Sequence, residues 1–254
     1  MSMTTRQTLS GPRIAARCAV LACLVALVSA CAGTAGPAQG INDPNEAKNR
    51  EVHEFNKSVD RGIIRPASKV YAVLPDPVER GVSNVAANLD VPGDVVNSLL
   101  QGRAGAAVGN TARFVVNTTV GLGGIFDPAG ALGIKGRTTD FGETLHVWGA
   151  AEGIYGEVPL LGPTTGRDLA GKVVDLALNP VRLILPEPEI YYATGAEAGS
   201  KLGDRARYSG SVDSVLYDSA DSYAQTRQIY LQTRRSALGQ TEGADEGFID
   251  PYSP

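Results

Sequence analysis

The sequence has few of the side chains that most often carry catalysis or bind metals. Its 254 residues include three cysteines, two histidines and one tryptophan. Neither His53 nor His146 has a second histidine or a cysteine at metal-ligand spacing, and no Gly-x-Ser-x-Gly segment presents a serine nucleophile. The sequence therefore predicts no metal site, no cofactor and no enzyme, and a hydrolytic triad of His146 with Asp140 or Glu143 stays open as an alternative.

Dense clusters of basic residues and phosphate-binding loops are also missing. The whole chain has a formal net charge of −4, whereas nucleic acids and anionic headgroups attract surfaces rich in lysine and arginine. The run Gly121-Leu122-Gly123-Gly124 lacks both the spacing of a dinucleotide fingerprint and the Gly-Lys-Ser or Gly-Lys-Thr ending of a triphosphate loop. We therefore expect no nucleic-acid partner, and we expect membrane contact to come from acyl chains and apolar surface.

All three cysteines lie in the first 31 residues, in a segment typical of export signals. Three arginines precede an uncharged run of 13 residues, 18–30, which is shorter than the ~20 apolar residues of a membrane-spanning helix. The run ends in Val28-Ser29-Ala30-Cys31, which resembles a bacterial lipobox. We predict that Cys31 becomes the acylated first residue of the mature protein, and an ordinary signal-peptide cut between residues 29 and 33 stays the alternative.

The chain is predicted to have four parts: a signal peptide over 1–30, the lipidated cysteine and a flexible tether over 31–42, a single domain over 43–238, and an acidic disordered tail over 239–254. Removal of the signal peptide takes away three arginines and no acid, which leaves a formal charge of −7. Ala32 stands where an aspartate would favour retention in the inner membrane. We therefore expect attachment to the outer membrane, which several acyl chains would make stable.

Short helices separated by proline and glycine dominate the predicted domain. Asp43-Pro44 offers a capping acid followed by a proline at the first helical position. Val52, Phe55 and Val59 lie on one face of the helix that follows, which predicts a core-facing apolar stripe.

Further along, the pattern predicts a helix over 78–89, a third helix opened by Pro92 and a final helix in the segment after Tyr208. The first half shows no sustained strand alternation. We therefore predict a predominantly all-α fold.

The stretch 104–126 has an unusual composition, because its only charged residue is Arg113. As one straight helix it would be roughly 34 Å long, but Gly121, Gly123 and Gly124 interrupt it. We predict a broken helix that is buried or interfacial, and a tightly packed core helix stays the alternative.

Four blocks of residues resemble the MlaA family, also called VacJ, at consistent spacing over about residues 43 to 235. The first runs from Leu89 to Gly102, the second from Arg113 to Asp127, the third from Asp140 to Gly149 and the fourth from Gly153 to Asp168. The residues that carry the family motifs include Asn97, Asp140, Phe141, Gly142, Trp148, Tyr155, Pro159, Gly162, Pro163, Arg167 and Asp168.

The resemblance implies an outer-membrane lipoprotein that removes mislocalised phospholipids from the outer leaflet and passes them to a soluble periplasmic carrier protein, which maintains lipid asymmetry. It also implies a ring of helices in the inner-leaflet region, an amphipathic channel and association with a trimeric porin. A lipid-anchored factor that braces a porin or envelope complex without moving lipid stays the alternative, and a phospholipase is a third class.

The residues that we expect to line such a lipid channel lie in the second block: Arg113, Asn117, Gly121, Gly123, Gly124 and Phe126. Arg113 is a candidate contact for a phosphate headgroup, with a salt bridge to an internal acid as the alternative. Trp148 and Tyr155 suit an interfacial depth, with core packing as the alternative. Glu157 departs from the family pattern and places a charge where a surface near lipid is expected.

Overall fold

The computed structural model describes residues 40–181 and 189–240. The predictions for the signal peptide, for Cys31, for the tether up to residue 39 and for the tail from residue 241 lie outside the described residues. The elements follow in the order α2 (Glu46–Val59), the π-helical segment η1 (Asp60–Ile64), α3 (Arg65–Tyr71), α4 (Asp76–Leu100), α5 (Ala104–Thr119), α6 (Pro128–Ala131), α7 (Phe141–Val147), β1 (Tyr155–Val158), β2 (Gly162–Thr165), α8 (Gly166–Leu178), α10 (Glu189–Arg207), α11 (Ser209–Asp213), the π-helical segment η2 (Ser214–Asp218) and α12 (Ser222–Ala237).

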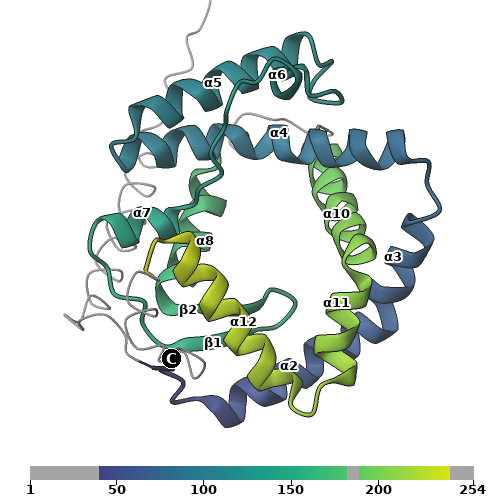
Figure 1. Cartoon of the computed structure of the whole chain (residues 1–254), viewed down its shortest axis with the longest axis vertical. Coiled ribbons are helices and arrows are strands. Elements are labelled where there is room, and N and C mark those ends of the chain that lie inside the picture. The colour runs from purple at the N-terminus through teal and green to yellow at the C-terminus, as the bar shows by residue number, and fades with distance from the viewer. Residues whose placement is uncertain (1–39, 182–188, 241–254) are drawn as a thin grey trace, which may run out of the picture.

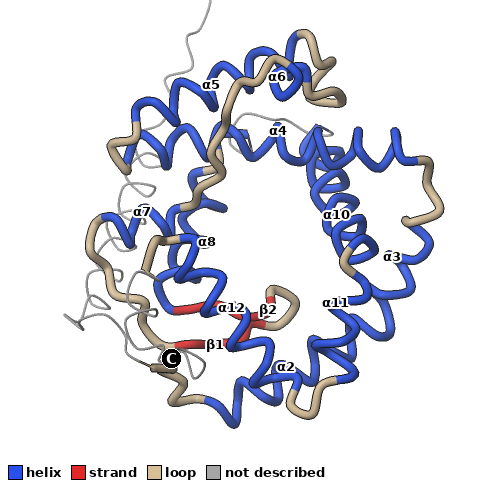
Figure 2. Tube along the Cα trace, viewed as in Figure 1, coloured by secondary structure: helices blue, strands red, loops and turns tan. Residues whose placement is uncertain are grey.

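The elements follow one another around a ring in the ribbon view (Figure 1). α4 forms one side with α5 and α6 outside it, α10 and α3 form the next side, and α2 lies opposite α4; Figure 2 shows that α12, α8, α7 and the short hairpin complete the ring. Contacts of α4 with α5 and α10, of α7 with α8 and of α2 with β1 join neighbouring elements. The predicted helical class is confirmed, and none of the helices in the described ranges is long and apolar enough to cross a membrane.

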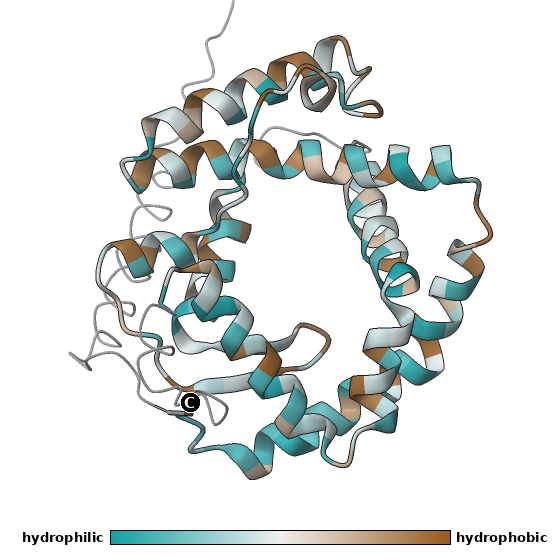
Figure 3. Cartoon of the chain, in the orientation of Figure 1, coloured by the Kyte–Doolittle hydropathy of each residue, from teal (hydrophilic) through white to brown (hydrophobic). Residues whose placement is uncertain are grey.

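Polar side chains, rather than apolar ones, fill most of the buried positions. Among residues 40–181 and 189–240, the buried apolar residues are four alanines and Leu145, Tyr155, Tyr223 and Leu231, whereas the buried polar residues are far more numerous. Large apolar side chains are exposed around the ring, with exposed fractions of 79% for Val73 and 71% for Leu132, and apolar positions appear on almost every element in Figure 3. Extensive exposed apolar surface is typical of proteins that contact a membrane or another protein.

The first helix differs from its prediction in both its start and its buried face. It begins at Glu46, and Asp43 does not cap it but accepts hydrogen bonds from Asn49, at 2.8 Å, and from Tyr223 and Arg227. Phe55 is 49% exposed, whereas Asn49 and His53 are the buried residues of α2. The predicted core-facing apolar stripe is wrong for Phe55, whereas Val52 and Val59 are half-buried beside the buried polar residues.

Pro92 does not open a separate helix but lies inside α4, which runs unbroken from Asp76 to Leu100. A proline in a helix interior costs about 3 kcal/mol. α4 packs against α5, α7 and α10, and this packing on several sides offsets that cost.

The helical pattern is broken in two further places, the second of which differs from its prediction. β1 and β2 pair antiparallel, with Tyr155 opposite Thr165 and Val158 opposite Gly162, and strands of four residues are too short to show alternation in sequence. The single helix predicted after Tyr208 is instead α11, η2 and α12. Asp221 starts α12 afresh by accepting a hydrogen bond from the backbone N–H of Ala224 at 3.0 Å.

The crossing of α7 and α8 generates a stability prediction. A Cβ atom on Gly171 would lie 2.3 Å from the backbone nitrogen of Gly142, whereas a Cβ on Gly105 in α5 would meet nothing within 4 Å. We expect Gly171→Ala to lower the free energy of unfolding by about 1–3 kcal/mol through overpacking, and Gly105→Ala to be neutral or stabilising by about 0.4–1 kcal/mol. Urea unfolding in a neutral detergent, followed by circular dichroism, measures both, and equal effects would contradict the close crossing.

Candidate functional site

An arginine of the last helix joins elements that are far apart in the sequence. Arg234 in α12 donates hydrogen bonds to both oxygens of Asp140, at 2.8 and 2.7 Å, and to both oxygens of Asp168, at 3.0 and 2.9 Å. Asp140 is the N-cap of α7, and Asp168 lies in the first turn of α8. Arg234 therefore holds α7, α8 and α12 together.

The carboxyl group of Asp168 is buried within this junction. Its other contacts are the hydroxyl of Tyr230, which donates to it at 2.7 Å, and Arg167, which is 5% exposed. Burial raises the pKa of Asp168, but the hydrogen bonds from Arg234 and Tyr230 outweigh burial and leave this pKa below its usual value. Gly142 lies against the same junction, where a Cβ atom would be 2.7 Å from Oδ1 of Asp168. The motif residues Asp140, Gly142, Arg167 and Asp168 are thus brought together.

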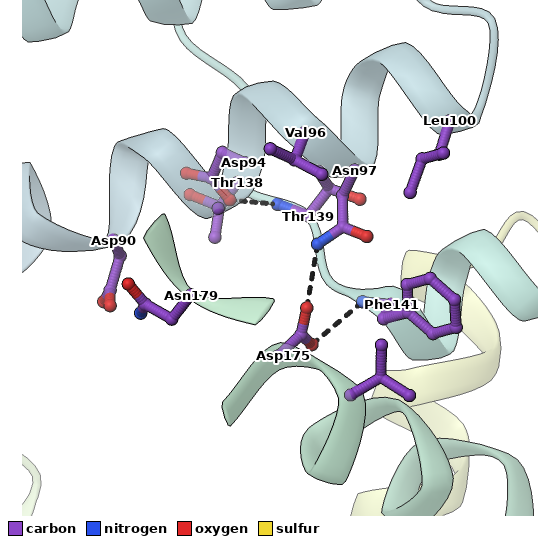
Figure 4. A pocket seen from close by; sticks show the side chains of 12 residues that line it. Asp90, Asp94, Val96, Asn97, Leu100, Thr138, Thr139, Phe141, Asp175 and Asn179 are labelled. Carbon is purple, nitrogen blue, oxygen red and sulfur yellow. Dashed lines mark hydrogen bonds between the residues drawn. The ribbon is translucent and has the colours of Figure 1, made fainter. Parts of the chain in front are cut away.

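A small cavity of about 200 Å³ lies beside this junction, between α4 and α8. Asp175 accepts hydrogen bonds from the Asn97 side chain and from the backbone N–H of Phe141, both at 2.9 Å, and Asp94 accepts one from the backbone N–H of Thr139 at 2.8 Å (Figure 4). Burial raises the pKa of Asp94 to about 7, and burial also raises the pKa of Asp175. Both carboxyl groups therefore have a pKa above the usual value of an aspartate.

Two larger cavities adjoin the ring helices. One of about 410 Å³ lies where α4, α8 and α10 meet and shares Asp90, Asp175 and Asn179 with the small cavity. The other, of about 620 Å³, lies between α12 and the segment formed by α11 and η2, with Val212, Leu216 and other apolar side chains in its lining. The ring thus contains both charged and apolar recesses.

The six residues predicted to line a lipid channel lie in α5 and the turn after it. Arg113 donates to both oxygens of Asp127, at 3.0 and 3.1 Å, and Asn117 donates to Asp127 at 2.8 Å. This is the internal salt bridge that the sequence left as the alternative to headgroup contact. In Figure 1, α4 lies between α5 and the interior of the ring, so this placement does not favour Arg113 and Asn117 as channel residues.

The glycines of that turn have a conformational role. A Cβ atom on Gly121 would lie 2.4 Å from the carbonyl oxygen of Asn117, and Gly123 and Gly124 have φ angles of +73° and +93°. Such φ angles favour glycine, so these residues end α5 and turn the chain toward α6. Phe126, the sixth residue, is 58% exposed.

The remaining motif residues lie around the hairpin and at the end of α7. Tyr155 is 1% exposed and packs edge-on against Tyr223 and Tyr230, which is the core-packing alternative. Trp148 is 56% exposed and donates to the carbonyl oxygen of Leu100 at 3.1 Å. The other three residues shape the hairpin: Pro159 in its turn, Gly162 with a φ of +75°, and Pro163 opposite Glu157.

Glu157 does not occupy an exposed surface near lipid, because it is 7% exposed. Nδ1 of His53 lies 3.0 Å from Oε1 of Glu157, and Nε2 of His53 lies 3.0 Å from the hydroxyl of Ser222. This buried cluster joins α2, β1 and α12. The expectation that Glu157 places a charge on a surface near lipid is therefore wrong, because its carboxylate is buried against His53 of α2.

The hydrolytic triad left open for His146 does not form. Asp140 is engaged by Arg234, and Glu143 is engaged by Arg103 and Arg137. Burial and the charge of Arg167 lower the pKa of His146. Within residues 40–181 and 189–240, no group of histidine, cysteine, aspartate and glutamate side chains could hold a metal ion.

Asp94 makes the stability of the protein depend on pH. Because its pKa in the folded protein, about 7, lies above its ordinary value of 3.8, its contribution to stability is fully present below about pH 4 and is lost as the pH rises through 7. Asp94→Asn keeps an oxygen for the N–H of Thr139 but cannot titrate. We expect the loss of unfolding free energy between pH 5 and pH 8 to be smaller in this variant by on the order of 1–3 kcal/mol.

Urea unfolding at the two pH values measures this difference, and Asp76→Asn is the control because the Asp76 side chain is 81% exposed. An equal pH dependence in wild type and Asp94→Asn would contradict the buried carboxyl group.

Comparison with known proteins agrees with this architecture. The sequence model of the MlaA lipoprotein family matches residues 41–237. The chain is 34% identical over 221 residues to the intermembrane phospholipid transport system lipoprotein MlaA of Escherichia coli (strain K12). This match covers 85% of this chain and 86% of that protein. It is 34% identical over 197 residues to the protein of the same name from Haemophilus influenzae, with 75% and 77% covered.

A solved structure from work on the structural basis for maintenance of bacterial outer membrane lipid asymmetry superposes with a TM-score of 0.67 and 31% sequence identity. The match covers 77% of this chain and 98% of that chain. The protein therefore belongs to the MlaA lipoprotein family.

Proposed function

We propose that this protein is an outer-membrane lipoprotein that removes mislocalised phospholipids from the outer leaflet through the centre of its ring and hands them to a periplasmic carrier. The observation that carries the proposal is the distribution of polarity, with polar side chains buried between the ring elements and large apolar side chains exposed. A body of this kind is suited to lie in lipid. The relatives from Escherichia coli and Haemophilus influenzae are named as phospholipid transport lipoproteins.

The physical problem in such transport is the polar headgroup. An unpaired charge in a hydrocarbon environment costs several kcal/mol, so a route lined by charged and hydrogen-bonding groups lowers the barrier. The recess between α4, α8 and α10 offers Lys172, Lys201 and Asp175 for the headgroup. The apolar recess beside α12 offers Val212 and Leu216 for acyl chains.

The direction of movement must come from other components, because no nucleotide-binding loop occurs in the sequence. Passive passage through the ring would be drawn toward the periplasm when a carrier removes the lipid. The apolar outer surface would contact the inner half of the outer membrane and a trimeric porin. Acylated Cys31 would anchor the protein to the outer membrane.

The proposal predicts that a normal distribution of phospholipid between the leaflets requires the anchor at Cys31. Cells that lack this protein should accumulate phospholipid in the outer leaflet, because nothing withdraws it. Wild type should restore the distribution, whereas Cys31→Ala should not, since the unanchored protein leaves the membrane. Cleavage of lipids on intact cells by an added phospholipase measures the outer-leaflet phospholipid.

An unchanged outer leaflet in the deletion strain, together with a disturbed envelope, would contradict transport. That result would favour the lipid-anchored factor that braces a porin or envelope complex.

A further inference from the structure

An apolar groove runs along α12 from its second turn to its last. It is the cavity of about 620 Å³ between α12 and the segment formed by α11 and η2, whose wall includes Val212 and Leu216. Figure 1 shows α11 and α12 diverging from the end of the ring at α2 toward its interior. The residues that α12 contributes to the lining recur at three- and four-residue spacing and so share one face of the helix: Thr226, Ile229, Tyr230, Thr233, Arg234 and Ala237. Ile229 is 44% exposed, so the described part of the chain leaves this apolar surface uncovered.

The chain leaves α12 at one end of this groove. Ala237, which lines the groove, is the last residue of α12. Gly239 follows with a φ of +70°, and the backbone N–H of Gln240 donates to the carbonyl oxygen of Arg235 at 2.9 Å. A left-handed glycine with a bond of this kind is a common helix end. The residues after Gln240 therefore begin close to the end of the groove.

The sequence after residue 240 carries three large apolar side chains close together: Phe248, Ile249 and Tyr252. The intervening residues 241–247 contain three acids and two glycines and no large apolar residue. The first apolar side chain follows Gln240 by eight residues, which span at most ~26–29 Å when extended. The wall that α12 gives to the groove, from Thr226 to Ala237, is roughly 17 Å long at 1.5 Å per residue. The apolar residues can therefore reach the whole length of the groove.

A polar atom in the groove favours a peptide over an acyl chain as its occupant. The hydroxyl oxygen of Thr226 is buried, and it has no hydrogen-bond partner among the described residues. A backbone N–H or carbonyl group of a bound peptide can satisfy this hydroxyl, whereas a hydrocarbon chain leaves it unpaired, which is unfavourable. Because residues 241–247 link the apolar residues to α12, their effective concentration at the groove is on the order of millimolar. Weak intrinsic binding is therefore enough to fill the groove.

We propose that the C-terminal segment, residues 248–252, binds this groove of its own chain, with the side chains of Phe248, Ile249 and Tyr252 against the apolar walls. The groove is the recess that the proposed function assigns to acyl chains, so the bound segment would exclude lipid from it. The intrachain binding does not depend on transport, whereas this regulatory consequence rests on the proposed function. The C-terminal segment thus acts as a plug that must leave before an acyl chain enters.

The test measures how far the C-terminal segment protects the groove from a thiol reagent in the full mature lipoprotein in lipid nanodiscs. One cysteine is introduced at Thr233, in the groove, or at Gln232, the neighbouring exposed residue outside the lining, and the chain without either change gives the background. We expect the combined substitution F248S, I249S and Y252S to raise the rate of maleimide labelling of Thr233→Cys at least fivefold. The rate for Gln232→Cys should not change. Equal rates for Thr233→Cys with the native and the substituted segment would overturn the proposal.

A disulfide between the two surfaces identifies the occupant. We expect Tyr252→Cys combined with Thr233→Cys to form a disulfide within one chain on mild oxidation, at least fivefold faster than Tyr252→Cys combined with Gln232→Cys. Disulfide-linked dimers as the main product would overturn the proposal in favour of a second copy in the groove. Absence of a faster disulfide, together with phospholipid that protects Thr233→Cys, would overturn it in favour of acyl chains.

The outer-leaflet measurement on intact cells separates this inference from the proposed function. Wild type that restores asymmetry, together with labelling rates that ignore the three apolar residues, would overturn the plug and leave transport standing. Protection by the C-terminal segment in a protein whose absence leaves the outer leaflet unchanged would support the intrachain binding and overturn transport.

Discussion

The ring depends on the contacts that Arg234 makes from the last helix. This guanidinium binds Asp140 at the start of α7 and Asp168 in the first turn of α8, with distances of 2.7 to 3.0 Å. Asp168 has only 4% of its side chain exposed, so loss of the arginine would leave a buried carboxylate without its main partner. Breaking a buried pair in this way costs about 3–5 kcal/mol. The last helix therefore closes a structure whose apolar core is small.

The ring buries mostly polar side chains and exposes large apolar ones. Other contacts within the ring also join buried polar side chains, since Arg205 pairs with Asp60 and His53 lies against Glu157. Buried groups of this kind are stable only when hydrogen bonds satisfy them. Lipid around the outside would supply the apolar environment that the exposed valines, leucines and tyrosines lack in water, and the charged recesses would remain for a polar headgroup.

The sequence allowed the helical class and the family to be predicted, but not the polarity of the buried faces. The break after α5 was predicted correctly because Gly121, Gly123 and Gly124 are local signals. The burial of His53 and Glu157 could not be read from periodicity, because a periodic pattern identifies the buried face of an element only when apolar residues occupy that face. Asp94, Asp175 and Arg234 were also missed, since ion pairs between distant segments leave no pattern in one sequence.

Hydrogen exchange in α12 tests the closing role of Arg234 most directly. The comparison is between Arg234→Met, which keeps the length of the side chain and removes its charge, and Gln228→Met, which changes an exposed residue of the same helix. With the protein in lipid nanodiscs, the account predicts that amide exchange in α12 rises at least tenfold in Arg234→Met and is unchanged in Gln228→Met. Unaltered exchange in Arg234→Met would contradict it.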